Sequence, residues 1–318
     1  MVKVLIIGAT GYIGGATAAA LRKNNHRVYG LARTADKAKA LAQNEIIPIE
    51  GSVDESDSYA KEIEKHAIDV IIDIAGPPST TQKLLADLAP VAEARNKKFS
   101  HGPSNKIGFI YCGGMWVHGS SVDPVSDLEL VGTDRATTNP PELVAWRPAL
   151  EDTILSKTDL FDSIVVRPAL VYGGISPIWG LPWGPIAAGL SSNASSVTIP
   201  VDAEAIASLI HVDDVATGFV AAVENLPILS KTYPVFDLST SFEPVALINQ
   251  LAARALGYKG KLEYHVPDGP DGLFPRAFGT TLNSSGSRLT ALTGWRPTKL
   301  SMLSEVDIYA QAWLAANN

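Results

Sequence analysis

The chain has 318 residues, of which 46% are hydrophobic and 19% are charged, and its formal net charge is −7. This size and composition predict a folded, enzyme-sized globular protein, and an acidic balance without a Lys/Arg cluster argues against a nucleic-acid partner. The single cysteine, Cys112, excludes an internal disulfide and a cysteine metal cluster. No apolar run reaches the roughly 20 residues that span a bilayer. Because no signal or transit peptide is expected before the first strand, a soluble cytoplasmic protein without a membrane partner is the expectation.

The first fifteen residues, MVKVLIIGATGYIGG, predict a strand, a glycine turn and a helix. The β-branched run Val2–Ile7 is typical of a strand buried on both faces, and the helix is expected to begin near Tyr12. Gly8 would permit the sharp turn, Gly11 would let a pyrophosphate approach the backbone, and Gly14 would let the helix lie close to its strand. An ordinary glycine turn is the alternative. The spacing favours a dinucleotide site formed by Gly8, Thr10, Gly11, Tyr12, Ile13 and Gly14.

The second predicted strand, Arg27–Arg33, indicates which dinucleotide binds. An acidic residue at the end of this strand would bind the ribose 2′-hydroxyl of NAD, but the chain has Arg33 there. An arginine can instead pair with the 2′-phosphate of NADP, so NADP is the expected cofactor. The alternative is that Arg33 is an ordinary surface charge. Lys37 on the next helix either assists Arg33 or is solvated, and solvation is the expectation.

Strand and helix patterns alternate along the first half of the chain. This alternation predicts an α/β fold with a doubly wound parallel sheet, in which right-handed crossovers bring the carboxyl ends of the strands, and any ligand, to one edge. The further strands are expected at Glu45–Glu50, Asp69–Ala75, Ile107–Cys112, Ser163–Arg167 and Val235–Leu238.

Two stretches, 173–193 and 266–286, are rich in glycine, proline and aromatic residues and do not read as strands. They are expected to form a wall or lid over the site, ahead of a C-terminal helix that begins near Ser301. The chain is therefore divided into an NADP-binding Rossmann domain, residues 1–172 and 206–241, and a smaller C-terminal substrate-binding lobe, residues 173–205 and 242–318.

Five motifs, in order, resemble those of the short-chain dehydrogenase/reductase superfamily. The similarity is to its extended or atypical members, which include the NAD(P)-dependent epimerase/dehydratases, and it runs along nearly the whole chain. GATGYIG is similar to the family's GxxGxxG, and the other four segments are DVIIDIAG at 69–76, VVRPALVYG at 165–173, IHVDDVA at 210–216 and TGWRP at 293–297.

The resemblance implies that Ala75 and Gly76 border the cofactor and that the turn from Pro168 to Leu170 lies beside the nicotinamide. The alternative for both segments is packing at strand ends.

The family's catalytic set does not transfer to this chain. The family uses a serine or threonine after strand five, then a tyrosine and, four residues later on a helix, a lysine. Alignment puts Gly114 at the serine, and on a helix over 142–151 it puts Leu143 at the tyrosine and Arg147 at the lysine. There is no YxxxK in the chain.

Arg147 cannot relay protons, because an arginine is not deprotonated in a protein. Two functional roles and one structural role are open to it: holding the ribose hydroxyls of the cofactor, binding a substrate anion, or forming a surface salt bridge with Glu151.

Candidate proton donors at strand ends are Tyr111, His118 and Tyr172. His118 is the best of them by its ordinary pKa, although a packing role is the competing interpretation. Cys112 is interpreted as a buried strand residue. The His-x-Asp-Asp run that starts at His211 is read as a helix cap and a hydrogen bond that joins the lobes, so no metal site is expected.

The function expected is an NADP(H)-dependent oxidoreductase that acts on a small, mostly apolar carbonyl, enone or imine without the usual proton donor. A non-redox isomerase or epimerase that uses NADP, and a non-catalytic NADP(H)-sensing regulatory protein, are the alternatives. Arg276 is a candidate partner for a substrate carboxylate, and the resemblance implies a homodimer through 80–96 and 142–156. Aromatic side chains that either line the substrate pocket or belong to the lobe core are Trp116, Trp179, Trp183, Phe274 and Phe278.

Overall fold

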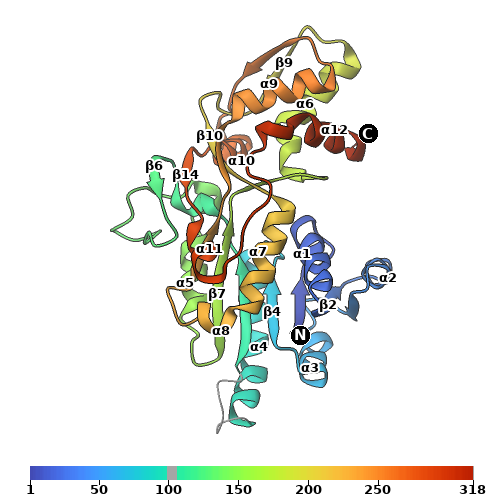
Figure 1. Cartoon of the computed structure of the whole chain (residues 1–318), viewed down its shortest axis with the longest axis vertical. Helices are drawn as coiled ribbons and strands as arrows, with labels where there is room; N and C mark the ends of the chain where they lie inside the picture. The colour runs from blue at the N-terminus through green and yellow to red at the C-terminus, as the bar shows by residue number, and fades with distance from the viewer. Residues whose placement is uncertain (99–105, 318) are drawn as a thin grey trace.

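The computed structural model describes residues 1–98 and 106–317 (Figure 1). In this part of the chain the largest element is a seven-stranded sheet in the order β11-β7-β5-β4-β1-β2-β3, with every neighbouring pair parallel. The order reverses between β1 and β4, which is the switch point of a doubly wound sheet, so the predicted α/β class is confirmed. The strands are β1 (Lys3–Ile7), β2 (Arg27–Ala32), β3 (Ile47–Glu50), β4 (Val70–Asp73), β5 (Ile107–Cys112), β7 (Phe161–Pro168) and β11 (Val235–Leu238).

Helices cover both faces of this sheet, which is why its central strands are apolar throughout. Val4 and Leu5 point to opposite faces of β1, and both are fully buried. The helices α1 (Tyr12–Lys23), α2 (Ala35–Gln43) and α7 (Val212–Glu224) pack on one face, with α1 and α7 side by side (Figure 1). The other face is covered by α3 (Ser56–His66), α4 (Pro78–Lys98) and α5 (Arg147–Leu155).

A smaller lobe lies beyond the carboxyl edge of the large sheet (Figure 1). It holds its own apolar core, in which Trp179 and Trp183 are buried. The division of the chain at the predicted domain boundaries stays a prediction. The remaining elements, of which α8 and α11 pack against the large sheet, are β6 (Ser121–Val125), β8 (Leu170–Tyr172), α6 (Gly180–Ser192), β9 (Ser196–Ile199), β10 (Ile206–His211), α8 (Leu226–Leu229), β12 (Ser241–Pro244), α9 (Val245–Leu256), β13 (Lys261–Tyr264), α10 (Leu273–Phe278), β14 (Leu282–Ser284), α11 (Ser287–Thr293) and α12 (Val306–Asn317).

Two sequence expectations about this lobe need correction. The sequence predicted that the stretch 173–193 forms no strand, and this is confirmed. The stretch is not an irregular wall, however, because most of it forms α6. Burial of the two tryptophans in the lobe core stabilises a helix whose glycine and proline content is unfavourable. The C-terminal helix begins at Val306, after a 3-10 turn, and not near Ser301.

The two lobes are joined at the start of α7, as the His-x-Asp-Asp run predicted. His211 caps the helix, its Nδ1 accepting a hydrogen bond from the Asp213 amide at 3.1 Å. The buried carboxylate of Asp214 accepts from the Thr298 amide and hydroxyl at 2.8 and 3.1 Å, and from the Lys299 amide at 2.8 Å. The predicted helix cap and lobe-joining hydrogen bond are therefore confirmed.

Candidate functional site

The glycine turn after β1 has the geometry that a bound dinucleotide needs. Gly8 adopts a φ of +93°, and a Cβ there would lie 2.8 Å from the Ile74 carbonyl oxygen. At Gly14 a Cβ would lie 2.1 Å from the carbonyl oxygen of Gly8, so the helix can approach its strand only because this residue is glycine. Gly11 is the exposed N-cap of α1.

The amino-terminal end of α1 is suited to an anion. Its first turn contains no acidic residue and no side chain caps it, so the first amides have no acceptor within the helix. The helix dipole adds a partial positive charge at the same end. Beside it, Gly76 has a φ of +96°, and the space where its Cβ would lie is open. These features fit the pyrophosphate of a dinucleotide.

A first cavity, of about 260 Å³, lies at the ends of β1, β2 and β4, and we call it the Arg33 pocket. Arg33, which is exposed, and Lys37, which is half-buried, both line it. Neither cation forms an ion pair with any of the residues that the structure describes. The full lining is Ile7, Gly8, Thr10, Leu31, Arg33, Lys37, Ser52, Val53, Asp54, Ala75, Pro77 and Thr80.

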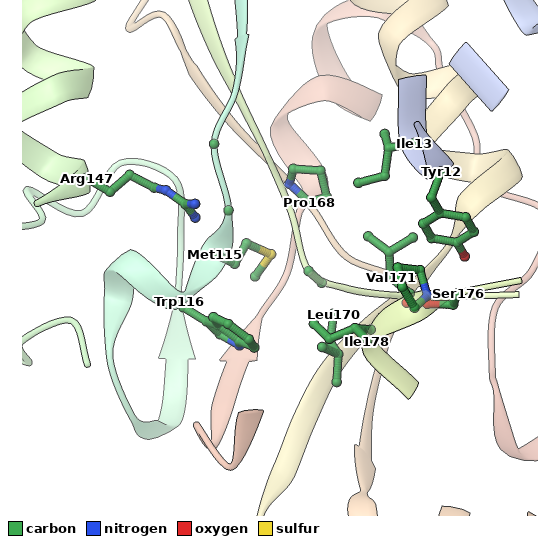
Figure 2. A pocket seen from close by; sticks show the side chains of 14 residues that line it. Tyr12, Ile13, Met115, Trp116, Arg147, Pro168, Leu170, Val171, Ser176 and Ile178 are labelled. Atoms are coloured by element: carbon green, nitrogen blue, oxygen red, sulfur yellow. The ribbon is translucent and has the colours of Figure 1, made fainter. Parts of the chain in front are cut away.

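A second cavity, also of about 260 Å³, lies where the carboxyl ends of β5 and β7 meet α1 and the segment after β8, and we call it the Trp116 pocket (Figure 2). Pro168 and Leu170, which the family resemblance places beside the nicotinamide, both line it. Sequence reasoning missed several of its residues, because no pattern links them before the chain folds. The lining is Tyr12, Ile13, Gly113, Gly114, Met115, Trp116, Arg147, Pro168, Ala169, Leu170, Val171, Ser176, Pro177 and Ile178.

Arg147 enters this pocket through the space that Gly114 leaves open. A Cβ at Gly114 would lie 2.5 Å from Nη1 of Arg147, so the guanidinium occupies the position that a side chain at residue 114 would need. Figure 2 shows the guanidinium extended toward the centre of the cavity. The guanidinium carbon lies 5.0 Å from the centre of the Trp146 ring.

Two expectations around Arg147 are wrong. Leu143 lies in a 3-10 turn, Glu142–Val144, and does not share a helix face with Arg147, because α5 begins only at Arg147 with a proline in its first turn. The alternative of a surface salt bridge to Glu151 also fails. That carboxylate is buried and accepts a hydrogen bond from Nε of Arg167 at 3.0 Å.

The structure places none of the three predicted proton donors in the Trp116 pocket. His118 is buried, with its Nε2 2.7 Å from Oδ2 of Asp237. Tyr172 is buried against His211, and its hydroxyl donates to the Lys299 carbonyl at 3.3 Å.

Tyr111 belongs to the core between the sheet and α4 and α5, since the alternation along β5 turns it away from the pocket. Burial raises the pKa of both tyrosines, so their predicted catalytic roles have no support in this geometry.

Two hydroxyl groups do line the pocket, those of Tyr12 and Ser176. The Tyr12 hydroxyl donates to the Gly173 carbonyl at 2.6 Å, and the Ser176 hydroxyl donates to the Val171 carbonyl at 2.9 Å. Burial raises the pKa of Tyr12. Both hydroxyls are thus engaged with the backbone, and the sequence indicated Tyr12 only as part of the glycine turn.

The aromatic residues divide between the pocket and the lobe core. Trp116 lines the pocket, and the Phe274 ring meets its edge with the ring centres 6.1 Å apart. Trp179, Trp183 and Phe278 are buried core residues.

Arg276 is exposed and donates to the Pro267 and Gly269 carbonyls, so the structure does not bring it to the pocket. Within the described residues, no group of three or more His, Cys, Asp or Glu side chains is arranged to hold a metal ion. In the same part of the chain, no helix is long and apolar enough to cross a membrane.

The comparisons with known proteins agree with this fold. Residues 4–95 match the sequence model of the NAD dependent epimerase/dehydratase family. This match covers the amino-terminal part of the chain, and it confirms the predicted resemblance to the extended short-chain dehydrogenase/reductases. No curated protein matched in a sequence comparison.

Solved structures extend the similarity to the whole chain at the level of the fold. A dTDP-glucose 4,6-dehydratase from Bacillus anthracis, in complex with NAD, has a TM-score of 0.72 at 13% identity, over 100% of this chain and 98% of that one. A UDP-glucose-4-epimerase from Stenotrophomonas maltophila, with bound NAD and formylated UDP-arabinopyranose, has a TM-score of 0.70 at 16% identity, over 100% and 99%. The UDP-glucose 4-epimerase from Thermotoga maritima, with UDP-glucose, has a TM-score of 0.71 at 17% identity, over 99% and 100%.

Proposed function

We propose that this protein is an NADP(H)-dependent oxidoreductase that reduces a small, mostly apolar carbonyl compound, enone or imine. The Trp116 pocket carries this proposal, because it adjoins the glycine turn and its described lining is largely apolar. A nucleotide sugar would leave most of its hydroxyl groups without partners on such a lining, in which Arg147 is the one charged side chain among the described residues. The pocket therefore favours a compact apolar substrate over the sugar nucleotides in the names of the structural relatives.

The residues around the glycine turn fit a nicotinamide dinucleotide. The free amides of α1 would hold the pyrophosphate, with Ala75 and Gly76 beside it. Arg33 and Lys37 are unpaired cations that suit the 2′-phosphate of NADP, although two of the relatives named above were solved with NAD. When bound, NADPH supplies the hydride for a carbonyl carbon, so that carbonyl, NADPH and one proton give an alcohol and NADP⁺.

The residues of this pocket would mainly position the substrate, and they are poorly suited to exchange protons with it. Arg147 is permanently charged, so it would hold or polarise an oxygen without donating a proton. The hydroxyls of Tyr12 and Ser176 are bonded to backbone carbonyls. We infer that water delivers the proton to the substrate oxygen.

Turnover of a substrate panel tests the proposal. Purified protein is mixed with NADPH and a set of aldehydes, ketones, enones and imines, and NADPH loss is followed by its near-ultraviolet absorbance. We expect turnover of at least one apolar panel member, and we expect Trp116→Ala to lower kcat/KM for it. Arg254→Gln, an exposed site on α9, is the control.

The same experiment separates the two competing functions. Tight NADPH binding without turnover of any panel member would contradict a reductase and favour an NADP(H) sensor. Conversion of a substrate with no net loss of NADPH would favour an isomerase or epimerase.

A further inference from the structure

Arg147 is the one charged side chain among the described residues that line the Trp116 pocket. Its Nε is buried and has no hydrogen-bond partner, and the guanidinium forms no ion pair with a described residue. The rest of the lining consists of apolar side chains, glycines and two hydroxyls that are already bonded to carbonyls. The pocket thus holds a positive charge for which none of the described residues provides an ion pair.

Two nearby carboxylates form their ion pair or hydrogen bonds with other groups, although the charge of Glu151 also interacts with that of Arg147. Glu151 pairs with Arg167, and Asp73 accepts hydrogen bonds from the Thr81 hydroxyl at 2.6 Å and the Ala75 amide at 3.0 Å. Packing holds the cation in place, with Trp146 on one side and the bare backbone of Gly114 on another. Because desolvating an unpaired charge costs free energy, this arrangement is favourable when a ligand brings the opposite charge.

We propose that Arg147 binds a carboxylate of the substrate, so that the substrate is a small apolar carboxylic acid. The guanidinium presents its donors in a planar fork that matches the two oxygens of a carboxylate. Ribose hydroxyls would satisfy the donors but would leave the charge unneutralised. The cavity volume of about 260 Å³ lies below the usual range for drug-sized ligands, and the nicotinamide beside Pro168 would share it, so the acid must be small. This inference rests on the proposed function only in taking the Trp116 pocket as the substrate site.

Matched pairs of acids and amides test this proposal without turnover. The probes are cinnamate, phenylacetate and hexanoate, each paired with its uncharged primary amide, and binding to the NADP⁺-saturated protein is measured by calorimetry. A charge-assisted hydrogen bond predicts a preference of roughly tenfold to hundredfold for the acid of at least one pair. Arg147→Gln removes this preference and leaves the amide's affinity unchanged. Arg147→Lys keeps the positive charge and should retain part of the preference. This result would show that the loss in Arg147→Gln does not come from a folding defect.

Two controls make the result specific. Arg254→Gln removes an exposed arginine on α9 and leaves every affinity unchanged. The affinity for NADP⁺ is measured for each variant, and we expect that of Arg147→Gln to stay within about threefold of the parent protein.

Three outcomes overturn the inference: no acid binds, an acid and its amide bind equally, or the preference survives in Arg147→Gln. A loss of NADP⁺ affinity in that variant, with the acid preference intact, assigns Arg147 to the cofactor instead. These binding results do not depend on NADPH oxidation, so a failed turnover panel contradicts the reductase alone.

Discussion

A pair of adjacent glycines in α1 allows a direct test of the close approach between this helix and β1. At Gly14 a Cβ would lie 2.1 Å from the Gly8 carbonyl oxygen, whereas at Gly15 it would lie 3.6 Å from the Ala9 carbonyl oxygen. The first distance is a clash with backbone and the second is an ordinary contact. We therefore expect Gly14→Ala and Gly15→Ala to change stability in opposite directions.

The magnitudes follow from these distances. For the new methyl group to reach 3.4 Å, α1 must move away from the turn by about 1.3 Å. Overpacking of this kind costs about 1–3 kcal/mol, and the better helix propensity of alanine offsets up to about 1 kcal/mol. Gly15→Ala meets no clash and gains that propensity alone. Because the propensity gain is common to both variants, they should differ by the overpacking cost, about 1–3 kcal/mol in the free energy of unfolding.

Urea denaturation followed by circular dichroism measures this difference, and calorimetry measures NADP⁺ affinity at the same time. We expect Gly14→Ala to lose affinity by at least tenfold, since the displaced helix moves its free amides. Gly15→Ala serves as the matched control. Equal stabilities, or an unchanged affinity in Gly14→Ala, would refute the view that glycine at residue 14 is required by packing.

Three further predictions concern other parts of the molecule. Arg33→Ala should weaken NADPH by about tenfold, from the loss of roughly 1.5 kcal/mol, and NADH hardly at all; equal losses in a fluorescence titration would contradict the NADP assignment. Asp214→Ala removes three hydrogen bonds at the lobe junction and should lower the free energy of unfolding by about 2–4 kcal/mol, and an unchanged urea midpoint would contradict this role. Burial raises the pKa of the Cys112 thiol to about 12, so at neutral pH iodoacetamide should modify the urea-unfolded protein and spare the native one. Equal rates of modification, measured by mass spectrometry, would exclude this burial.

The sequence predicted the fold well, because its central strands are β-branched runs that end in glycine or proline. β5 and β11 lie at the predicted residues. α6 was missed, because its helix is stabilised by the burial of Trp183 and not by local propensity.

The site was predicted in part. The glycine turn and Arg33 could be identified because each belongs to a short local pattern in the chain. In the structure both line the Arg33 pocket. The contact between Gly114 and Arg147 joins two segments that touch only after folding, so no spacing rule indicates it. The proton-donor candidates failed for a related reason: proximity to a strand end does not determine which way a side chain points.

The edge strand β11 has a consequence for how this protein is made. β11 pairs with β7, yet it follows β8, α6 and β10 in the chain. During translation the edge of β7 that β11 covers therefore stays unpaired until β8, α6, β10 and α7 have emerged from the ribosome. Asp237, which lies on β11, is also the partner of the buried His118 ring. A nascent chain that stops before β11 would expose the edge of β7 and would leave His118 without its carboxylate partner. This interval is therefore the stage of synthesis most exposed to aggregation.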